Sequence, residues 1–407
     1  MVKYYGVALA LALGLVGCGS EDSEDLESKK SYYGIAQTGQ SLAEGGVGND
    51  VIDGVYYPAF PGRTMMLNPS PIGVKDEILS KEVAELQESN RVTIGHSLTK
   101  DLAEGNENVY VFHGQAFGGQ NYQALKKGGY TKVFEKIIDQ VENVKRQYNE
   151  LKYIAITNIH GEQDGLDGNE NYHNDLIEWV NDFNSDIKRV TSQEEDIIMY
   201  ICQVSSSGGY GYNGGISENE FTTPIQQLLA HDNSDKVVLV TPKYFLPYYD
   251  HSHITNLGQR ILGEYYAKAI SSGSKYQPLS PSSIVGLGSK LTVNFKGRVG
   301  DLVFDTEMVK PIDNMGFQYK DDNQNEIKEV KLINNNVVIN LTGEIGNNPV
   351  LSYAYHNGDG GKENQINGFG DRGNLRDSNS QASSYDDEYM LYNWSVIFRQ
   401  HVLVNRN

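Results

Sequence analysis

Positive charge is scarce in this sequence: 34 lysines and arginines stand against 53 aspartates and glutamates, a formal net charge of −19. A chain this acidic repels other polyanions, which argues against nucleic acid and anionic lipid headgroups as partners. Long apolar runs are lacking too, since Ala8 to Val16 is too short to cross a bilayer as a helix of the mature protein. With 39% hydrophobic and 21% charged residues, the 407-residue chain is typical of a soluble globular protein with two domains.

Cysteine occurs only twice, at positions 18 and 202. Lys3 and the short apolar run lead to Leu15-Val16-Gly17-Cys18, which resembles a bacterial lipobox. The resemblance implies a lipoprotein signal peptide over residues 1–18, with cleavage before Cys18 and diacylation of its thiol. Gly19, rather than Asp, follows the cysteine, which implies sorting to the outer membrane. We therefore expect a lipid-anchored protein of the bacterial cell envelope, facing the periplasm or the exterior; the alternative is a signal peptide cut elsewhere, with Cys18 incidental.

Acylation of Cys18 leaves Cys202 as the one thiol of the mature chain, so no intramolecular disulfide bond forms. Cys202 lies in the apolar run from Ile197 to Val204, and we expect it in the core. Residues 19–30 are polar and acidic and have no periodicity, which predicts a flexible tether between the lipid anchor and the first domain.

Short apolar runs alternate with amphipathic stretches between residues 31 and 275. Apolar residues recur at helical spacing within residues 130–149 and again within residues 255–270. This alternation predicts an α/β domain with a parallel sheet that is covered by helices on both faces. The expected strands are Tyr33–Ala36, Val109–Phe112, Tyr153–Ile159, Ile197–Val204 and Val237–Val240.

The pattern changes beyond residue 275, where Pro278 and Pro281 interrupt any helix. Short runs of β-branched and aromatic residues follow, split by Gly, Asn and Asp, which predicts a smaller all-β, sandwich-like domain over residues 276–407. Residues 357–384 are rich in Gly, Asn, Asp and Ser and predict a long loop. The expected strands are Lys290–Phe295, Asp301–Phe304, Glu329–Ile333, Asn336–Leu341, Pro349–Tyr355 and Tyr392–Phe398.

Two segments carry a serine and a histidine in positions suited to nucleophilic catalysis. Gly39-Gln40-Ser41 follows the first predicted strand, where a serine is exposed at the edge of the sheet, although such a serine is as often only a helix cap. Asp250-His251-Ser252-His253 precedes the last helix of the α/β region. Asp250 and His253 are three residues apart, so the carboxylate can fix the imidazole tautomer while the second ring nitrogen takes a proton from a serine. His251 is the competing histidine, and a helix cap is the competing role for Asp250 and Ser252.

Two further segments follow the second and third predicted strands. Gly118-Gly119 lets a main-chain N–H approach a ligand oxygen, as an oxyanion hole requires, although an ordinary glycine turn has the same composition. His160-Gly161-Glu162-Gln163-Asp164 places an N–H donor at a strand end, with Glu162 able to orient its neighbours. The same side chains occur in metal sites, but no second histidine-rich cluster has matching spacing, and we expect no metal.

Taken in order, the four segments resemble the SGNH hydrolases, and within them the sialate O-acetylesterase and acetylxylan esterase branch. That branch has G-Q-S, G-G, Q-G-E-x-D and D-x-x-H blocks, and the match covers residues 32–272. The resemblance implies a flavodoxin-like, three-layer α/β/α domain. The sequence departs from the pattern at His160, which stands in place of a glutamine, and at Leu42, which stands in place of an asparagine.

The resemblance implies a triad of Ser41 as nucleophile, His253 as general base and Asp250 as its orienting partner. It also implies the substrate and reaction: a serine esterase that removes O-acetyl groups from sialic acid or polysaccharide through an acyl-enzyme, without a cofactor. A lipase or thioesterase of the same superfamily is one alternative, although no long apolar lid segment lies near Ser41 or Gly119 in the sequence. A non-catalytic glycan-binding surface lipoprotein is the other, and the intact triad argues against it.

The oxyanion hole implied by the resemblance consists of three donors. Two are the main-chain N–H groups of Ser41 and Gly119, with Gly118 as the alternative to Gly119. The third is the side chain at position 160, where a neutral imidazole of His160 would still donate an N–H. Gln40, Gly118 and Glu162 are expected to support the site.

Overall fold

The computed structural model describes residues 30–46, 57–88, 91–206, 221–358, 370–379, 381–386 and 389–405. The predicted signal peptide with Cys18 and nearly all of the predicted tether lie outside these residues, so both remain predictions. Within the described residues, no helix is long and apolar enough to cross a membrane.

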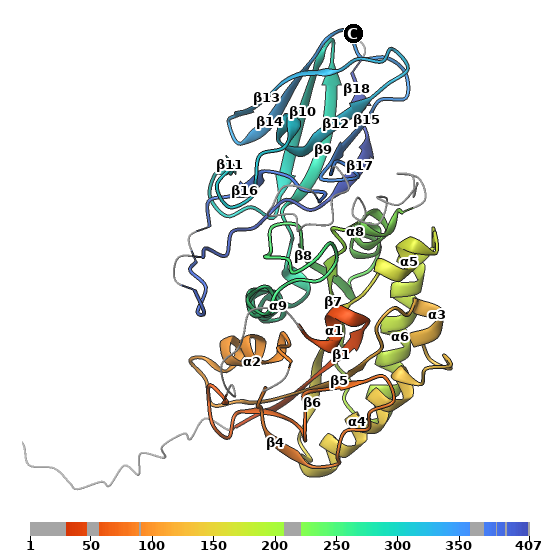
Figure 1. Cartoon of the computed structure of the whole chain (residues 1–407), viewed down its shortest axis with the longest axis vertical. Helices are drawn as coiled ribbons and strands as arrows, with labels where there is room; N and C mark the ends of the chain where they lie inside the picture. Colours follow the sequence, from red (N-terminus) through yellow and green to blue (C-terminus); the bar gives the residue numbers. More distant parts are fainter. Residues whose placement is uncertain are drawn as a thin grey trace, which may run out of the picture.

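An eight-stranded sheet forms the centre of the α/β region (Figure 1). The strand order is β4-β2-β5-β1-β6-β7-β8, β3 also pairs with β5, and every pair is parallel except β2 with β4. The predicted parallel sheet is thus confirmed, and its β5-β1-β6-β7-β8 core has the flavodoxin-like order. The strands are β1 (Tyr32–Gly39), β2 (Thr64–Leu67), β3 (Ile72–Val74), β4 (Val83–Glu85), β5 (Val109–Ala116), β6 (Lys152–Ile159), β7 (Ile198–Gln203) and β8 (Val237–Pro242).

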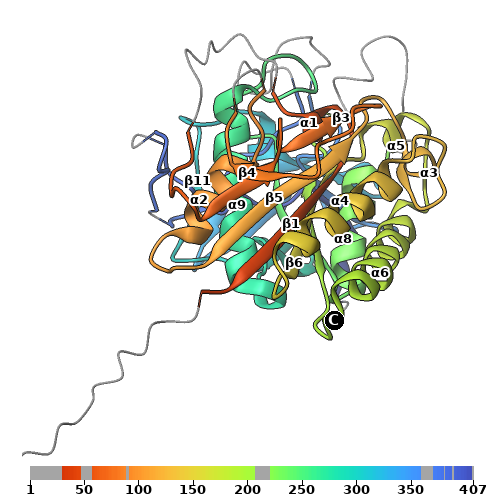
Figure 2. The ribbon, with the colours of Figure 1, turned by 90° about the horizontal axis from the view of Figure 1, so that it is seen from below.

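Helices cover both faces of this sheet, α2 and α9 on one face and α4, α6 and α8 on the other (Figure 2). The helical spacing predicted for residues 130–149 is confirmed in α4, whose Val133, Ile137, Val141 and Val144 are all buried. Cys202 is buried in β7, as expected. The helices are α1 (Ser41–Glu44), α2 (Gly95–Ala103), α3 (Tyr122–Leu125), α4 (Val133–Gln147), α5 (Glu162–Leu166), α6 (Tyr172–Thr191), α8 (Thr223–Asn233), α9 (Asn256–Ser272) and the short η2 (Gly273–Lys275).

The C-terminal region is built from strands apart from one 3-10 turn, η3 (Asp313–Gly316), within the described residues (Figure 1). A five-stranded sheet, β13-β14-β10-β9-β18, faces a three-stranded sheet, β12-β15-β17, and Phe295 of the first contacts Phe398 of the second. This sandwich confirms the predicted all-β fold. The strands are β9 (Ser280–Leu287), β10 (Lys290–Lys296), β11 (Leu302–Phe304), β12 (Phe317–Lys320), β13 (Ile327–Ile333), β14 (Asn336–Leu341), β15 (Val350–Tyr353), β16 (Leu375–Asp377), β17 (Phe398–His401) and β18 (Leu403–Val404).

Two expectations for the C-terminal region were wrong. The run Tyr392–Phe398 forms no strand before Phe398: it makes an isolated bridge from Trp394 to Arg376 of β16, while the Trp394 ring packs against Phe245. The predicted loop 357–384 contains strand β16, which pairs with β11 through Leu375, Arg376 and Asp377. Residues 359–369 of that loop lie outside the described residues.

The segment before β17 joins the two regions. Trp394 stacks on Phe245 with ring centroids 5.3 Å apart. Gln203, at the end of β7, donates its side-chain amide to the carbonyl of Ile397 and accepts the N–H of the same residue, both at 2.7 Å. The Tyr244 hydroxyl donates to the carbonyl of Ser395 at 2.8 Å. The C-terminal region is therefore fixed to the carboxyl ends of β7 and β8, beside the edge of the sheet that carries the candidate site.

Candidate active site

Strand β1 lies at the point where the strand order of the parallel sheet reverses, with β5 on one side and β6 on the other. In open α/β sheets this point leaves a crevice at the carboxyl ends of the strands, where ligands bind. The segments that follow β1, β5 and β6 are those that begin with Gln40, Gly118 and His160. The fold therefore brings three of the four sequence motifs to one edge of the sheet.

Ser41 is the first residue of α1 and follows a tight turn out of β1. Gly39 adopts φ = 143°, and a Cβ atom there would lie 2.3 Å from the carbonyl oxygen of Ile159, so only glycine fits. The N–H of Gln40 donates to the same carbonyl at 3.2 Å and fixes the turn to β6. This local geometry presents the Ser41 hydroxyl at the sheet edge.

The Ser41 hydroxyl lies 2.9 Å from Nε2 of His253, and Nδ1 of His253 lies 2.9 Å from the nearer carboxylate oxygen of Asp250. The main-chain N–H groups of Ser252 and His253 also donate to Asp250, at 2.8 and 2.7 Å. Burial opposes ionisation of Asp250, but these hydrogen bonds lower its pKa to about 2. The hydrogen bond to Asp250 in turn raises the pKa of His253. The three side chains form a relay in which a proton can pass from Ser41 to a stabilised imidazolium.

His251, the competing histidine of the segment, lines the same cavity as Ser41. The short contact to the Ser41 hydroxyl belongs to His253, so the structure favours His253 as the base. Asp250 is bound to the imidazole of His253 rather than acting only as a helix cap, and the cap of α9 is the hydroxyl of Thr255.

Two main-chain N–H groups beside the Ser41 hydroxyl are available as oxyanion donors. The N–H groups of Ser41 and Gly119 make no hydrogen bond within the described residues, because Ser41 begins its helix and Gly119 adopts φ = 68° in a turn. The N–H of Gly118 instead donates to a carboxylate oxygen of Glu44 at 2.6 Å. This contact removes Gly118 as the alternative donor and leaves Gly119.

The structure corrects the expectation for His160. Its imidazole has an exposed fraction of 0%, and it does not line the cavities beside Ser41. Its Nδ1 lies 2.6 Å from the hydroxyl of Tyr172 and its Nε2 lies 3.0 Å from the carbonyl oxygen of Gln120. Both ring nitrogens are thus occupied inside the protein, and the ring packs edge-on against Trp179. His160 therefore supports the loop after β5 and does not donate to an oxyanion.

Glu162 forms a buried ion pair with Lys243 at the end of β8, with 2.6 Å between Nζ and Oε1. Burial opposes the charge on both side chains, but their attraction lowers the pKa of Glu162 and raises that of Lys243. Asp164 accepts hydrogen bonds from the N–H of Tyr122 and from Asn169, both at 2.8 Å. The described residues contain no group of three or more side chains arranged to hold a metal ion.

Two cavities meet at Ser41. One, of about 330 Å³, is largely apolar and includes Leu42, Tyr249 and Ile254. The other, of about 430 Å³, is more polar and includes Gln40, Gly119 and Lys75. Glu44, Ser41 and His253 line both cavities.

Three charged residues near these cavities were not found by sequence reasoning: Glu44, Lys75 and Lys243. Lys75 lies between β3 and the next loop, far from any recognised motif, and only the pairing of β3 with β5 brings it near Ser41. Glu44 was within reach of sequence reasoning, because it lies three residues after Ser41 on the same short helix.

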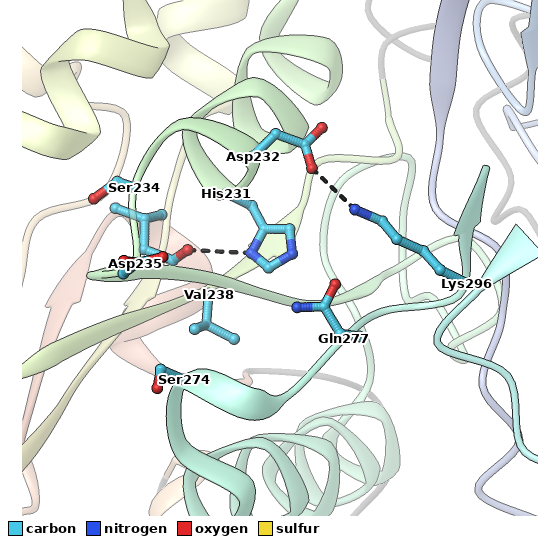
Figure 3. A pocket seen from close by; sticks show the side chains of 9 residues that line it. His231, Asp232, Ser234, Asp235, Val238, Ser274, Gln277 and Lys296 are labelled. Atoms are coloured by element: carbon cyan, nitrogen blue, oxygen red, sulfur yellow. Dashed lines mark hydrogen bonds and ion pairs between the residues drawn. The ribbon is translucent and has the colours of Figure 1, made fainter. Parts of the chain in front are cut away.

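A separate pocket of about 170 Å³ between α8 and the C-terminal region also contains a histidine and carboxylates (Figure 3). There, Nδ1 of His231 lies 3.2 Å from the carbonyl oxygen of Val237, and Lys296 pairs with Asp232 at 3.3 Å. Within the described residues, no serine hydroxyl is hydrogen-bonded to His231. This pocket lacks the serine–histidine contact that distinguishes the site at Ser41.

A family described as carbohydrate esterase, sialic acid-specific acetylesterase, matches residues 64–272, a range that contains Gly119, Asp250 and His253 and begins after Ser41. No curated protein matches the chain in sequence.

One solved structure shares the fold over most of this chain at low sequence identity, and two others align with lower TM-scores. A novel carbohydrate acetylesterase from Xanthomonas citri is 12% identical, with a TM-score of 0.54 over 90% of this chain and 80% of that chain. The protein NanS is 13% identical, with a TM-score of 0.41 over 61% of this chain and 99% of that chain. A carbohydrate acetylesterase from Sinorhizobium meliloti, Est24, is 11% identical, with a TM-score of 0.36 over 59% of this chain and 99% of that chain.

The family match over residues 64–272 confirms the resemblance to the sialate O-acetylesterase branch. Because the matched range covers just over half of the sequence, the chain belongs to the carbohydrate esterase family of sialic acid-specific acetylesterases.

Proposed function

We propose that the protein is a serine esterase that removes O-acetyl groups from carbohydrate, with Ser41, His253 and Asp250 as its catalytic triad. The observation that carries the proposal is the unbroken chain of contacts from the Ser41 hydroxyl through His253 to Asp250, 2.9 Å at each step. Family membership supplies the substrate class, and O-acetylated sialic acid is the first candidate.

Acylation begins when the Ser41 oxygen attacks the ester carbonyl carbon and Nε2 of His253 takes the hydroxyl proton. The negative charge that develops on the carbonyl oxygen is stabilised by the N–H groups of Ser41 and Gly119, each donor contributing about 10²- to 10³-fold in rate. The bond to the sugar oxygen then breaks, and the imidazolium returns its proton to that oxygen. The products of this half-reaction are the free sugar hydroxyl and acetyl-Ser41.

Deacylation follows the same path with water in place of the sugar. His253 takes a proton from a water molecule, whose oxygen attacks the acetyl carbonyl carbon. The bond to the Ser41 oxygen then breaks, that oxygen recovers the proton, and acetate leaves. Asp250 holds the Nδ1 proton of His253 throughout, so the base keeps the tautomer that faces Ser41.

The location of the enzyme belongs to the same proposal. Diacylation of Cys18 would anchor the protein in the cell envelope, and residues 19–30 would separate the catalytic region from the membrane. Cys18→Ser is expected to release the protein from the membrane fraction, which cell fractionation and labelling with a radioactive fatty acid would measure. Membrane association and label that persist in Cys18→Ser would contradict the anchor.

The catalytic proposal is tested by hydrolysis of p-nitrophenyl esters of increasing acyl length by the chain without residues 1–18. We expect activity on acetyl that falls sharply by butyryl and is abolished in Ser41→Ala. Acetate release from O-acetylated sialic acid, compared with acetylated xylan, then identifies the sugar. Activity that survives in Ser41→Ala, or that rises with acyl length, would contradict the proposal.

A further inference from the structure

The larger of the two cavities beside Ser41, of about 430 Å³, contains a side-chain donor that has no partner among the residues that the structure describes. Gln40 is 4% exposed and lines this cavity together with Ser41 and Gly119. Its Oε1 accepts the main-chain N–H of Gln163 at 3.3 Å. Its amide nitrogen makes no hydrogen bond within the described residues, and it is not sealed from the cavity. Because buried polar groups are almost always hydrogen-bonded, this amide N–H is suited to donate to an atom of a bound ligand.

The orientation of this amide is determined by its surroundings. Gln163 is in the first turn of α5, where a main-chain N–H has no acceptor inside the helix. Only the oxygen of the Gln40 amide can accept that N–H, because the opposite orientation would place two donors against each other. The NH₂ group of Gln40 is therefore held away from Gln163.

The backbone of Gln40 is fixed as well, so the amide is a preorganised group rather than a mobile one. Its N–H donates to Ile159, and its carbonyl accepts the N–H groups of Ala43 and Glu44 at 2.8 and 3.2 Å. Preorganised donors stabilise a developing charge without a reorganisation penalty during the reaction.

We propose that the side-chain NH₂ of Gln40 is the third oxyanion donor of this enzyme, beside the N–H groups of Ser41 and Gly119. The proposal assigns to Gln40 the role that His160 cannot take, because both imidazole nitrogens of His160 are bound to Tyr172 and Gln120. Gln40 is then a catalytic residue that touches the substrate carbonyl oxygen. The inference rests on the proposed esterase function.

The test is Gln40→Met, which keeps the length of the side chain and removes both amide protons. Because an oxyanion donor acts in the transition state, we expect kcat on p-nitrophenyl acetate to fall about 10²-fold, with KM changed less than about threefold. Gln40→Glu retains an acceptor for the Gln163 N–H but adds negative charge, and we expect a larger fall in kcat. Thermal unfolding of each variant checks that the protein is folded.

A matched glutamine serves as the control. Gln318 lies in β12 of the sandwich and lines neither cavity beside Ser41, so Gln318→Met is expected to change kcat less than about threefold. A second readout is the affinity for methylboronic acid, which forms a tetrahedral adduct on a serine. We expect Gln40→Met to weaken this affinity by a factor similar to the loss in kcat/KM, which a merely structural role would not produce.

The outcomes separate this inference from the proposed function. Wild-type activity that is lost in Ser41→Ala but unchanged in Gln40→Met would overturn only the role of Gln40. The same holds if KM alone changes, or if Gln318→Met loses as much kcat as Gln40→Met. Absence of any ester hydrolysis by the wild-type protein would overturn both.

Discussion

His253 must be neutral before it can accept a proton from Ser41, so its pKa sets the acid limb of the pH–rate profile. The hydrogen bond to Asp250 raises this pKa, and the limb therefore lies above the pH expected for a free imidazole. Asp250→Asn removes the stabilising charge, so we expect the limb to move to lower pH while kcat falls by up to about 10⁴-fold. The measurement is kcat/KM on p-nitrophenyl acetate against pH, and an acid limb that stays in place would contradict the assignment of Asp250.

Glu44 places a carboxylate beside the site of the developing oxyanion, where it accepts the N–H of Gly118 and lines both cavities. Glu44→Gln keeps an acceptor for Gly118 and removes the charge, which repels an anionic substrate. We expect kcat/KM for O-acetylated sialic acid to rise about three- to tenfold relative to a neutral acetyl ester.

The matched control for this change is Glu107→Gln. It removes the same charge from an exposed residue before β5, at the opposite edge of the sheet from Gly118. Because added salt screens charge, the advantage of Glu44→Gln should shrink at high ionic strength. An equal effect of both variants would show that net charge, and not the position of Glu44, is responsible.

Single residues differ in how far their roles can be predicted from sequence. Ser41, Asp250 and His253 lie in short motifs whose spacing is meaningful, and the structure brings them together. His160 lies in such a motif as well, but both of its ring nitrogens are hydrogen-bonded, to the Tyr172 hydroxyl and the Gln120 carbonyl. These two contacts form only in the folded chain. A motif therefore indicates where a residue lies, whereas tertiary contacts decide which of its atoms remain available.

At the scale of elements, the ion pair between Glu162 and Lys243 connects the start of α5 to the end of β8, and Glu162 lines the cavity beside Ser41. Lys243→Met leaves the Glu162 carboxylate buried without its partner, and we expect it to lower the free energy of unfolding by about 3–5 kcal/mol. Replacing Glu162 by Gln in the same chain removes the unpaired charge and should restore part of that loss.

Urea unfolding of Lys243→Met, Glu162→Gln and the double variant measures this coupling. A pair that stabilises the loop should also affect catalysis, because Gln163, which holds the Gln40 amide, follows Glu162 directly. Strictly additive losses in the two single variants would contradict coupling between the charges.

In the α/β region, sequence patterns predicted the long strands and missed the short ones, whereas in the C-terminal region they also missed the eight-residue strand β9 (Ser280–Leu287). The five long strands β1, β5, β6, β7 and β8 follow continuous apolar runs, because both faces of a parallel sheet are covered. Strands β2, β3 and β4 were missed, since three or four residues carry too little periodicity to distinguish them from loops. Tyr392–Phe398 has the composition of a strand, but before Phe398 it forms an isolated bridge to Arg376 of β16, and its Trp394 ring is buried against Phe245.

At the scale of the whole molecule, that buried segment joins the α/β region to the β sandwich. The aromatic stack of Trp394 on Phe245 and the two hydrogen bonds between Gln203 and Ile397 are formed at the ends of β7 and β8, and the segment with Asp250 and His253 follows β8. The interface is therefore expected to make the two regions unfold together, as one cooperative unit.

Trp394→Ala tests this coupling. Trp394 is 1% exposed, and removal of its side chain leaves a cavity at the interface, so we expect the free energy of unfolding to fall by about 3–5 kcal/mol. Because Trp394 lines neither cavity beside Ser41, kcat on p-nitrophenyl acetate should remain within about twofold below the new melting temperature. The control is Leu403→Ala in β18 of the five-stranded sheet. Leu403 is 66% exposed, so this change should alter the free energy of unfolding little. Two separate transitions in the calorimetric scan of the wild-type protein would show that the interface does not couple the two regions. One transition that moves to lower temperature in Trp394→Ala would instead show that the β sandwich stabilises the α/β region through the ends of β7 and β8.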